Sequence, residues 1–150
     1  HPDHSGLPIS KCREQIGSRG NPRTFDWTKT SSDLGYEVID IDRYREIGPQ
    51  AVVEIIRQRV GDMPLYITLD LDCFDTTVAP GVANLEVGTE GLWQRDVLHM
   101  LRGMRGLDII GGDVVCLMPT KDHANKITAH LSAVMMFEMI CLIADGQRAA

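Results

Sequence analysis

Short apolar runs alternate with longer amphipathic ones along the chain. Tyr36–Asp42 alternates apolar and polar residues, which is typical of a strand with one buried face. Leu65–Leu71 is apolar and rich in β-branched residues, which predicts a central strand of a sheet. Arg13–Arg19 and Leu107–Cys116 are predicted as further strands, the latter with a bulge at Gly111-Gly112.

The segments between these runs carry apolar residues at helical spacing. The last helix is predicted to start after a capping residue, either Asp122 or Asn125, and to run to about Ala144. Because it is apolar almost all round, we expect it to be buried against a sheet or a partner. The other expected segments are a short helix or loop over 25–34, a helix opening at Gly48-Pro49, and a helix over Thr89–Leu101.

The order of these elements predicts an α/β fold. Strands that alternate with helices form βαβ crossovers, so we expect a three-layer architecture with a mainly parallel sheet and helices on both faces. The 150 residues suit one domain spanning 1–150. Ligands of such sheets bind at the carboxyl ends of the strands, and candidate chemistry is therefore sought there.

Composition narrows the class of protein. With 43% apolar and 24% charged residues, the chain is neither disordered nor fibrous. Its net charge of −6 argues against a nucleic-acid partner and suits a cationic substrate. The 4 cysteines form no C-x-x-C pair, the chain has no long uninterrupted apolar run, and it starts without a signal-peptide pattern. We therefore expect a cytoplasmic protein with no membrane partner.

Two aspartates at the end of the Leu65–Leu71 run are the clearest chemical feature. Asp70 and Asp72 are two residues apart, which in a strand directs both side chains to one face. Two carboxylates this close need a counter-charge to stay ionised, and a divalent cation such as Mg or Mn supplies it. The alternatives are aspartates that cap backbone N–H groups, or a Walker B strand. The chain lacks the G-x-x-x-x-G-K-[ST] loop that a Walker B strand requires.

The run LYITLDLDCFDTTVAPGVANLEVG closely resembles the third metal motif of the ureohydrolase family, which includes arginase and agmatinase. Asp70 and Asp72 match the two aspartate ligands of that motif. Asp75 matches its third aspartate, and Ala79-Pro80-Gly81 matches its Ala-Pro-Gly. QIGSRG, GLDIIGGDVV and PTKDHANKITAHLSA resemble further family segments in the same order. The chain thus resembles the C-terminal part of a ureohydrolase domain with an arginase-like fold.

This resemblance implies a metal-dependent hydrolase. It implies two divalent ions, manganese first and nickel second, which activate water for attack on a guanidinium carbon and release urea plus an amine or ammonia. In that scheme Asp70 bridges both ions and Asp72 completes the shell of one, so Asp72 is also a candidate catalytic residue. The implied substrate is a small guanidino cation, with agmatine-like compounds and guanidino acids first. The family also implies a homo-oligomer.

The chain departs from the family at its beginning. The upstream Gly-Gly-Asp-His-Ser and Asp-Ala-His-x-Asp motifs are absent, so the chain alone lacks most of the implied metal ligands and is expected to be incomplete as an enzyme. The segment HSGLPIS aligns with the family's His-Gly-x-Pro loop, which makes His4 a candidate proton shuttle. The alternative is a solvated terminal histidine.

A second departure concerns Cys116, which stands where the family has a glutamate that pairs with the substrate guanidinium. A neutral thiol cannot form that charge-assisted pair. Either the substrate is held differently, for which free guanidine is a candidate, or the chain is a catalytically silent homologue with a structural or regulatory role. A third possibility, from a different class, is a Mg-binding receiver-like domain.

Two further residues are candidates for substrate binding. Glu86 keeps a carboxylate in the loop that the resemblance places at the border of the site, and the alternative is a solvated loop acid. His123 follows Asp122 in a match to the family's Asp-His-Ala segment. That pair either orients the substrate loop or caps the last helix, and we favour capping.

Overall fold

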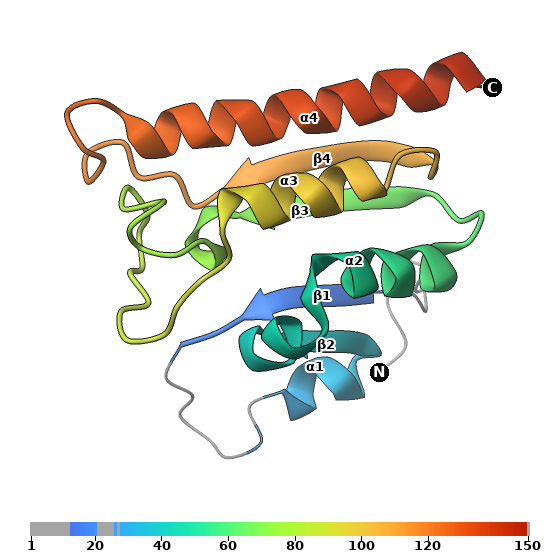
Figure 1. The fold of residues 1–150 in the computed structure, drawn as a ribbon, viewed down its shortest axis with the longest axis horizontal. Coiled ribbons are helices and arrows are strands. Elements are labelled where there is room, and N and C mark those ends of the chain that lie inside the picture. The colour runs from blue at the N-terminus through green and yellow to red at the C-terminus, as the bar shows by residue number, and fades with distance from the viewer. Residues whose placement is uncertain (1–12, 21–25, 27, 150) are drawn as a thin grey trace, which may run out of the picture.

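The computed structural model describes residues 13–20, 26 and 28–149 (Figure 1). Strands and helices alternate along the chain, as the hydrophobic pattern predicts. In chain order, the elements are β1 (Arg13–Ser18), α1 (Lys29–Asp33), β2 (Tyr36–Asp40), α2 (Ile41–Val60), β3 (Leu65–Asp70), the 3-10 turn η1 (Leu71–Cys73), α3 (Gln94–Gly103), β4 (Ile109–Val115) and α4 (Ile127–Ala149).

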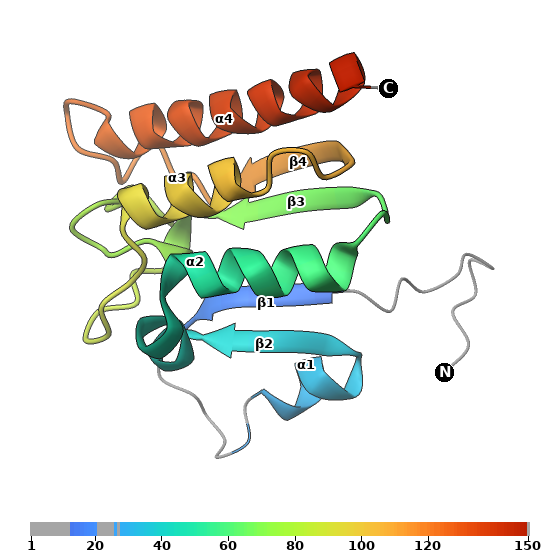
Figure 2. The same cartoon turned by 45° about the vertical axis from the view of Figure 1, so that its right-hand side comes forward.

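The strands form two parallel pairs. β1 pairs with β2, and β3 pairs with β4. The arrowheads of these strands point toward the same side of the molecule (Figure 2). The carboxyl ends of the strands therefore lie on that side, where the sequence predicts the chemistry. The prediction of an α/β fold with parallel strands is confirmed.

The long helices pack in sequence beside the strands. α2 contacts α3, α3 contacts α4, and α4 also lies along β4 (Figure 2). The α2–α3 contact is close, because a Cβ at Gly103 would lie 2.7 Å from a methyl group of Val53. Buried side chains from the helices and strands form one core, which includes Ile39, Val52, Ile56, Leu71, Val97, Leu101 and Ile109. This core fixes the strand ends relative to one another.

α2 begins earlier than the sequence predicts. The Asp40 side chain caps it, since Oδ1 accepts a hydrogen bond from the backbone N–H of Arg43 at 2.8 Å, and β2 therefore ends at Asp40. Gly48 interrupts the helix with φ 76° and ψ 169°, a left-handed φ that glycine adopts without strain. Pro49 then begins the second segment, so the predicted start at Gly48-Pro49 corresponds to a break inside the helix.

α3 begins later than predicted, at Gln94 and not at Thr89. The residues just before it are bonded to the turn after β3. Leu92 N–H donates to the Cys73 carbonyl at 2.8 Å, and Asp75 N–H donates to the Leu92 carbonyl at 3.0 Å. These long-range bonds hold the segment extended, which local helical spacing cannot reveal.

The fourth strand has a bulge, but at Ile110 and not at the predicted Gly111-Gly112. The pairing of β3 with β4 passes from Leu65 opposite Ile109 to Tyr66 opposite Gly111, which leaves Ile110 as the extra residue. The bulge lies at the start of the strand. From Tyr66 onward the register is regular, and it brings the last residue of β3 beside the last residue of β4.

α4 buries one face and exposes another. Met135 and Met139 are fully buried, whereas Phe137 is 64% and Ile140 54% exposed. Burial against the sheet and α3 is therefore observed on one face, and burial of the other face against a partner stays a prediction. Glu138 is paired with Arg102 of α3.

Among the described helices, Ile127–Gly146 alone is long and apolar enough to cross a membrane. The core helix of a soluble protein meets the same criteria of length and composition.

Candidate metal centre at the ends of β3 and β4

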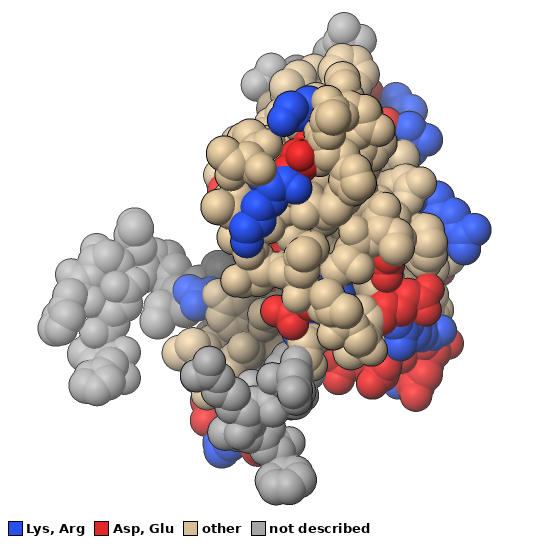
Figure 3. All heavy atoms as spheres, turned by 90° about the vertical axis from the view of Figure 1, so that its left-hand side faces the viewer, with Lys and Arg blue, Asp and Glu red and all other residues tan. Residues whose placement is uncertain are grey.

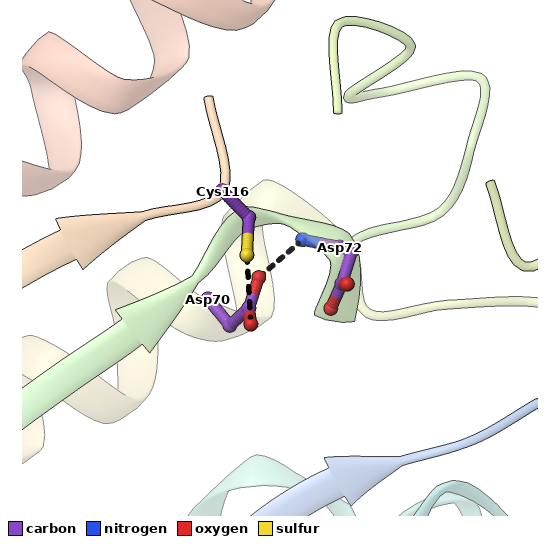
Figure 4. Close-up of side chains that lie close together, drawn as sticks. All are labelled: Asp70, Asp72 and Cys116. Carbon is purple, nitrogen blue, oxygen red and sulfur yellow. Dashed lines mark hydrogen bonds between the residues drawn. The ribbon is translucent and has the colours of Figure 1, made fainter. Parts of the chain in front are cut away.

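The acid pair lies at the carboxyl end of β3 (Figure 4). Asp70 is the last residue of the strand, and Asp72 lies in the following 3-10 turn. The Asp72 backbone N–H donates to Asp70 Oδ1 at 3.1 Å. The two side chains are therefore brought together by a tight turn, and not by the two-residue period of a continuing strand that the sequence suggested.

Cys116 reaches the acid pair from the neighbouring strand. Val115, the last residue of β4, pairs with Asp70, so the next residue lies directly beside the acid pair. The thiol of Cys116 donates to Asp70 Oδ2 with an Sγ–O distance of 3.1 Å. One donor atom from each of Asp70, Asp72 and Cys116 can be chosen so that all three lie within 4.8 Å of one another.

Negative charge at this cluster is poorly compensated. The pKa of Asp72 is raised to about 6, first by burial and then by the charge and hydrogen bonding of Asp70, while Arg19 opposes the shift. The pKa of the Cys116 thiol is raised to about 11, chiefly by its hydrogen bond to Asp70. Asp72 and Cys116 therefore hold their protons more strongly than isolated groups would, and a bound cation would offset this by favouring their ionised forms.

Arg19 holds the loop that follows the acid pair. Its Nη2 donates to the backbone carbonyls of Asp72 at 2.8 Å and Phe74 at 2.6 Å. Its Nη1 donates to the carbonyls of Glu86 at 2.7 Å and Thr89 at 2.9 Å. One guanidinium thus joins the end of β1 to both ends of the loop. Local sequence does not reveal these contacts of Arg19, because its partners are distant in the chain.

Glu86 lies near the acid pair. Its side chain is half-buried and covers Gly20, where a Cβ would lie 2.6 Å from Glu86 Oε2. Its charge contributes to raising the pKa of Asp72. The structure thus brings Glu86 to the same end of the molecule, as the sequence predicts. Figure 3 looks onto this end and shows acidic and basic side chains intermingled on its surface.

Asp122 caps α4. Its carboxylate accepts from the backbone N–H groups of Thr128 at 3.2 Å and Ala129 at 3.0 Å. Gly81 of the Ala-Pro-Gly segment packs against it, and a Cβ there would lie 2.7 Å from Asp122 Cβ. His123 is exposed in the turn before α4, and its role in substrate binding stays a prediction. His4 lies outside the described residues.

A model of the arginase family matches residues 8–141 of this chain. The chain belongs to the arginase family. The family named from the motifs is therefore confirmed, and with it the α/β fold class.

Relatives of known activity extend this result. Guanidinopropionase from Pseudomonas aeruginosa is 37% identical over 132 residues, which cover 88% of this chain and 41% of the relative. Agmatinase from Photorhabdus laumondii is 35% identical, over 99% of this chain and 45% of the relative. The solved structure of proclavaminate amidino hydrolase from Streptomyces clavuligerus superposes with a TM-score of 0.80 at 32% identity, over 89% of this chain and 43% of that one. The chain thus spans less than half the length of these members of the arginase family.

Proposed function

We propose that the intact protein containing this chain hydrolyses a small guanidino compound to urea and an amine or ammonia. The observation that carries the proposal is the poorly compensated acid pair at the end of β3 in an arginase-family chain. The names of the relatives, guanidinopropionase and agmatinase, support hydrolysis over the silent homologue. The cytoplasmic location and the homo-oligomer stay predictions.

The residues of the cluster fit divalent metal ions. Asp70 and Asp72 offer carboxylate oxygens, which suit manganese and similar ions, and partial burial beside a like charge would make a bound cation favourable at Asp72. Bound ions would supply Lewis acidity and lower the pKa of a water molecule. We propose Asp70 and Asp72 as metal ligands, with manganese first and nickel second, alongside ligands from outside this chain.

The chain's own residues would orient this site and its substrate. The Asp72 N–H fixes one oxygen of Asp70, and Arg19 fixes the backbone that follows. Glu86 adds negative charge near the acid pair, which attracts a guanidinium group. We propose Glu86 and His123 for substrate binding and His4 as a proton shuttle. Cys116 offers no carboxylate for a charge-assisted pair, so free guanidine remains a candidate beside agmatine-like compounds and guanidino acids.

The test is urea release by the intact protein. The protein is stripped of metal with a chelator, reloaded with Mn²⁺ or Ni²⁺, and incubated with agmatine, 3-guanidinopropionate, 4-guanidinobutyrate and guanidine. We expect urea and the matching amine in equal amounts from at least one compound, and about 1,000-fold less urea after Asp70→Asn. Asp33→Asn, which changes an exposed acid far from the cluster, is the matched control. Metal-loaded protein that releases no urea from any of the four would contradict the proposal.

A further inference from the structure

We propose that the Cys116 thiol is a direct sulfur ligand to the metal ion held by Asp70, and that it shifts the metal preference of this site from Mn²⁺ toward Co²⁺, Ni²⁺ and Zn²⁺. The inference rests on the proposed metal site. It adds a ligand at the position where the family resemblance has a glutamate that binds substrate.

The backbone of Cys116 is held on both sides. Before Cys116, β4 is paired with β3 up to Val115 opposite Asp70. After it, Leu117 forms an antiparallel bridge with Val82, and Met118 N–H donates to the Gly81 carbonyl at 2.8 Å. The Cys116 backbone therefore cannot move far from the acid pair without breaking these hydrogen bonds, and in the observed rotamer its thiol contacts Asp70.

The spacing suits a shared ion. Metal–oxygen bonds of about 2.1 Å and metal–sulfur bonds of about 2.3 Å place the two donors about 3.1 Å apart at a right angle and about 3.6 Å apart at a tetrahedral angle. The observed separation of Cys116 Sγ and Asp70 Oδ2 is 3.1 Å. An ion bound by both atoms therefore requires little or no movement of the chain.

The chemistry of binding is a simple proton exchange. The S–H bond of Cys116 breaks, its proton leaves to water, and the sulfur electron pair forms the bond to the metal ion, with no change of oxidation state. Thiolate is a softer donor than carboxylate, so it favours later divalent metals over Mn²⁺. A carboxylate at this position would not introduce this bias.

Cobalt titration of the metal-free intact protein tests the inference, because cobalt bound to thiolate absorbs in the near ultraviolet by charge transfer from sulfur. We expect this absorption to appear with Co²⁺ and to be lost in Cys116→Ser. We also expect Cys116→Ser to weaken Co²⁺ and Zn²⁺ binding about 10-fold or more, with Mn²⁺ affinity changed by less than about 3-fold. Cys116→Glu is a second variant, expected to bind metal without the absorption.

Two other cysteines serve as controls. Cys141 is exposed on α4, so Cys141→Ser should keep the absorption. Cys73 follows Asp72 directly, and absorption that survives Cys116→Ser but is lost in Cys73→Ser would assign the sulfur to Cys73 and overturn the inference. Cobalt binding measured by calorimetry without any charge-transfer absorption would also overturn it, while leaving the proposed function intact. No binding of Co²⁺ or Mn²⁺ at all would overturn both.

Discussion

Two sets of carboxylates occupy the same end of this molecule under opposite conditions. Asp75 and Asp122 receive hydrogen bonds from the protein itself: Asp75 from Thr77 and Gly91, and Asp122 from the first turn of α4. These bonds lower the pKa of both groups. Asp72 is instead half-buried beside Asp70, and its pKa is raised to about 6.

The difference separates structural acids from binding acids. A carboxylate that already accepts several hydrogen bonds from the protein is stabilised little further by a bound cation. A carboxylate that is desolvated beside a like charge is stabilised by it strongly. All of these aspartates except Asp122 lie within a few residues of one another in the sequence. Proximity in the sequence therefore does not distinguish the two roles, whereas partial burial beside a like charge sets Asp72 apart.

The largest expected effect comes from removing a binding acid. We expect Asp70→Asn in the intact, metal-loaded protein to lower urea release by about 1,000-fold, because an amide cannot replace a carboxylate that bridges or holds cations. Metal content measured on the same sample should fall in parallel. Retained metal and retained activity would place Asp70 among the structural acids.

Replacing Arg19, whose guanidinium holds the loop after the acid pair, should lower the stability of the fold. Arg19→Met deletes four hydrogen bonds to carbonyl groups, and we expect the free energy of unfolding to fall by about 2–4 kcal/mol. Urea denaturation of the intact protein measures the change. The control is Arg43→Met, which removes an exposed pair with Glu46 and should change stability by less than about 0.5 kcal/mol. If both variants changed the free energy of unfolding by less than about 0.5 kcal/mol, the hydrogen bonds of Arg19 would not contribute to stability.

Much of the fold could be predicted because its signals are local. The apolar runs of β2 and β3 and the long apolar stretch of α4 identify those elements from residues that are neighbours in the chain. The starts of α2 and α3 were predicted wrongly for identifiable reasons. One depends on the side-chain cap of Asp40, and the other on bonds to Cys73 and Asp75 that no periodicity records.

In the site, too, some residues could be predicted from the local sequence, whereas other contacts depend on long-range folding. Asp70 and Asp72 could be predicted because they are two residues apart in the sequence, at the end of an apolar strand. The contact of Cys116 with Asp70 depends on the register of β3 against β4, and the contacts of Arg19 depend on how a whole loop folds back. Family resemblance indicated the importance of Cys116, but only the register showed that its sulfur faces a carboxylate.

A structural acid should affect stability and not metal binding. Asp75→Ala removes hydrogen bonds from the Thr77 backbone and hydroxyl and from the Gly91 N–H, and we expect a loss of about 1–2 kcal/mol in the free energy of unfolding. Manganese affinity, measured by calorimetry on the folded protein, should change by less than about 3-fold. Loss of metal with unchanged stability would remove Asp75 from the structural set.

The smallest effect expected is the pH dependence of the metal-free protein. Because the folded-state pKa of Asp72 is raised from 3.8 to about 6, the folded state holds a proton that the unfolded state releases between these values. Asp72 therefore destabilises the fold above pH 6, and this penalty disappears as the pH falls toward 4. Asp75 and Asp122 act in the opposite direction, since their lowered pKa values stabilise the fold at neutral pH and that stability is lost in acid.

The variant Asp72→Asn isolates the contribution of this one group. Solvent screening of a half-exposed carboxyl reduces the expected gain to about 1 kcal/mol at pH 7, relative to the metal-free parent. This gain should vanish at pH 4, because the parent's Asp72 is then largely protonated in the fold. Urea denaturation at both pH values, with chelator present, measures the two differences. A variant that is less stable than its parent at pH 7 would mean that Asp72 is compensated by the protein, and the contrast between binding and structural acids would then fail at this residue.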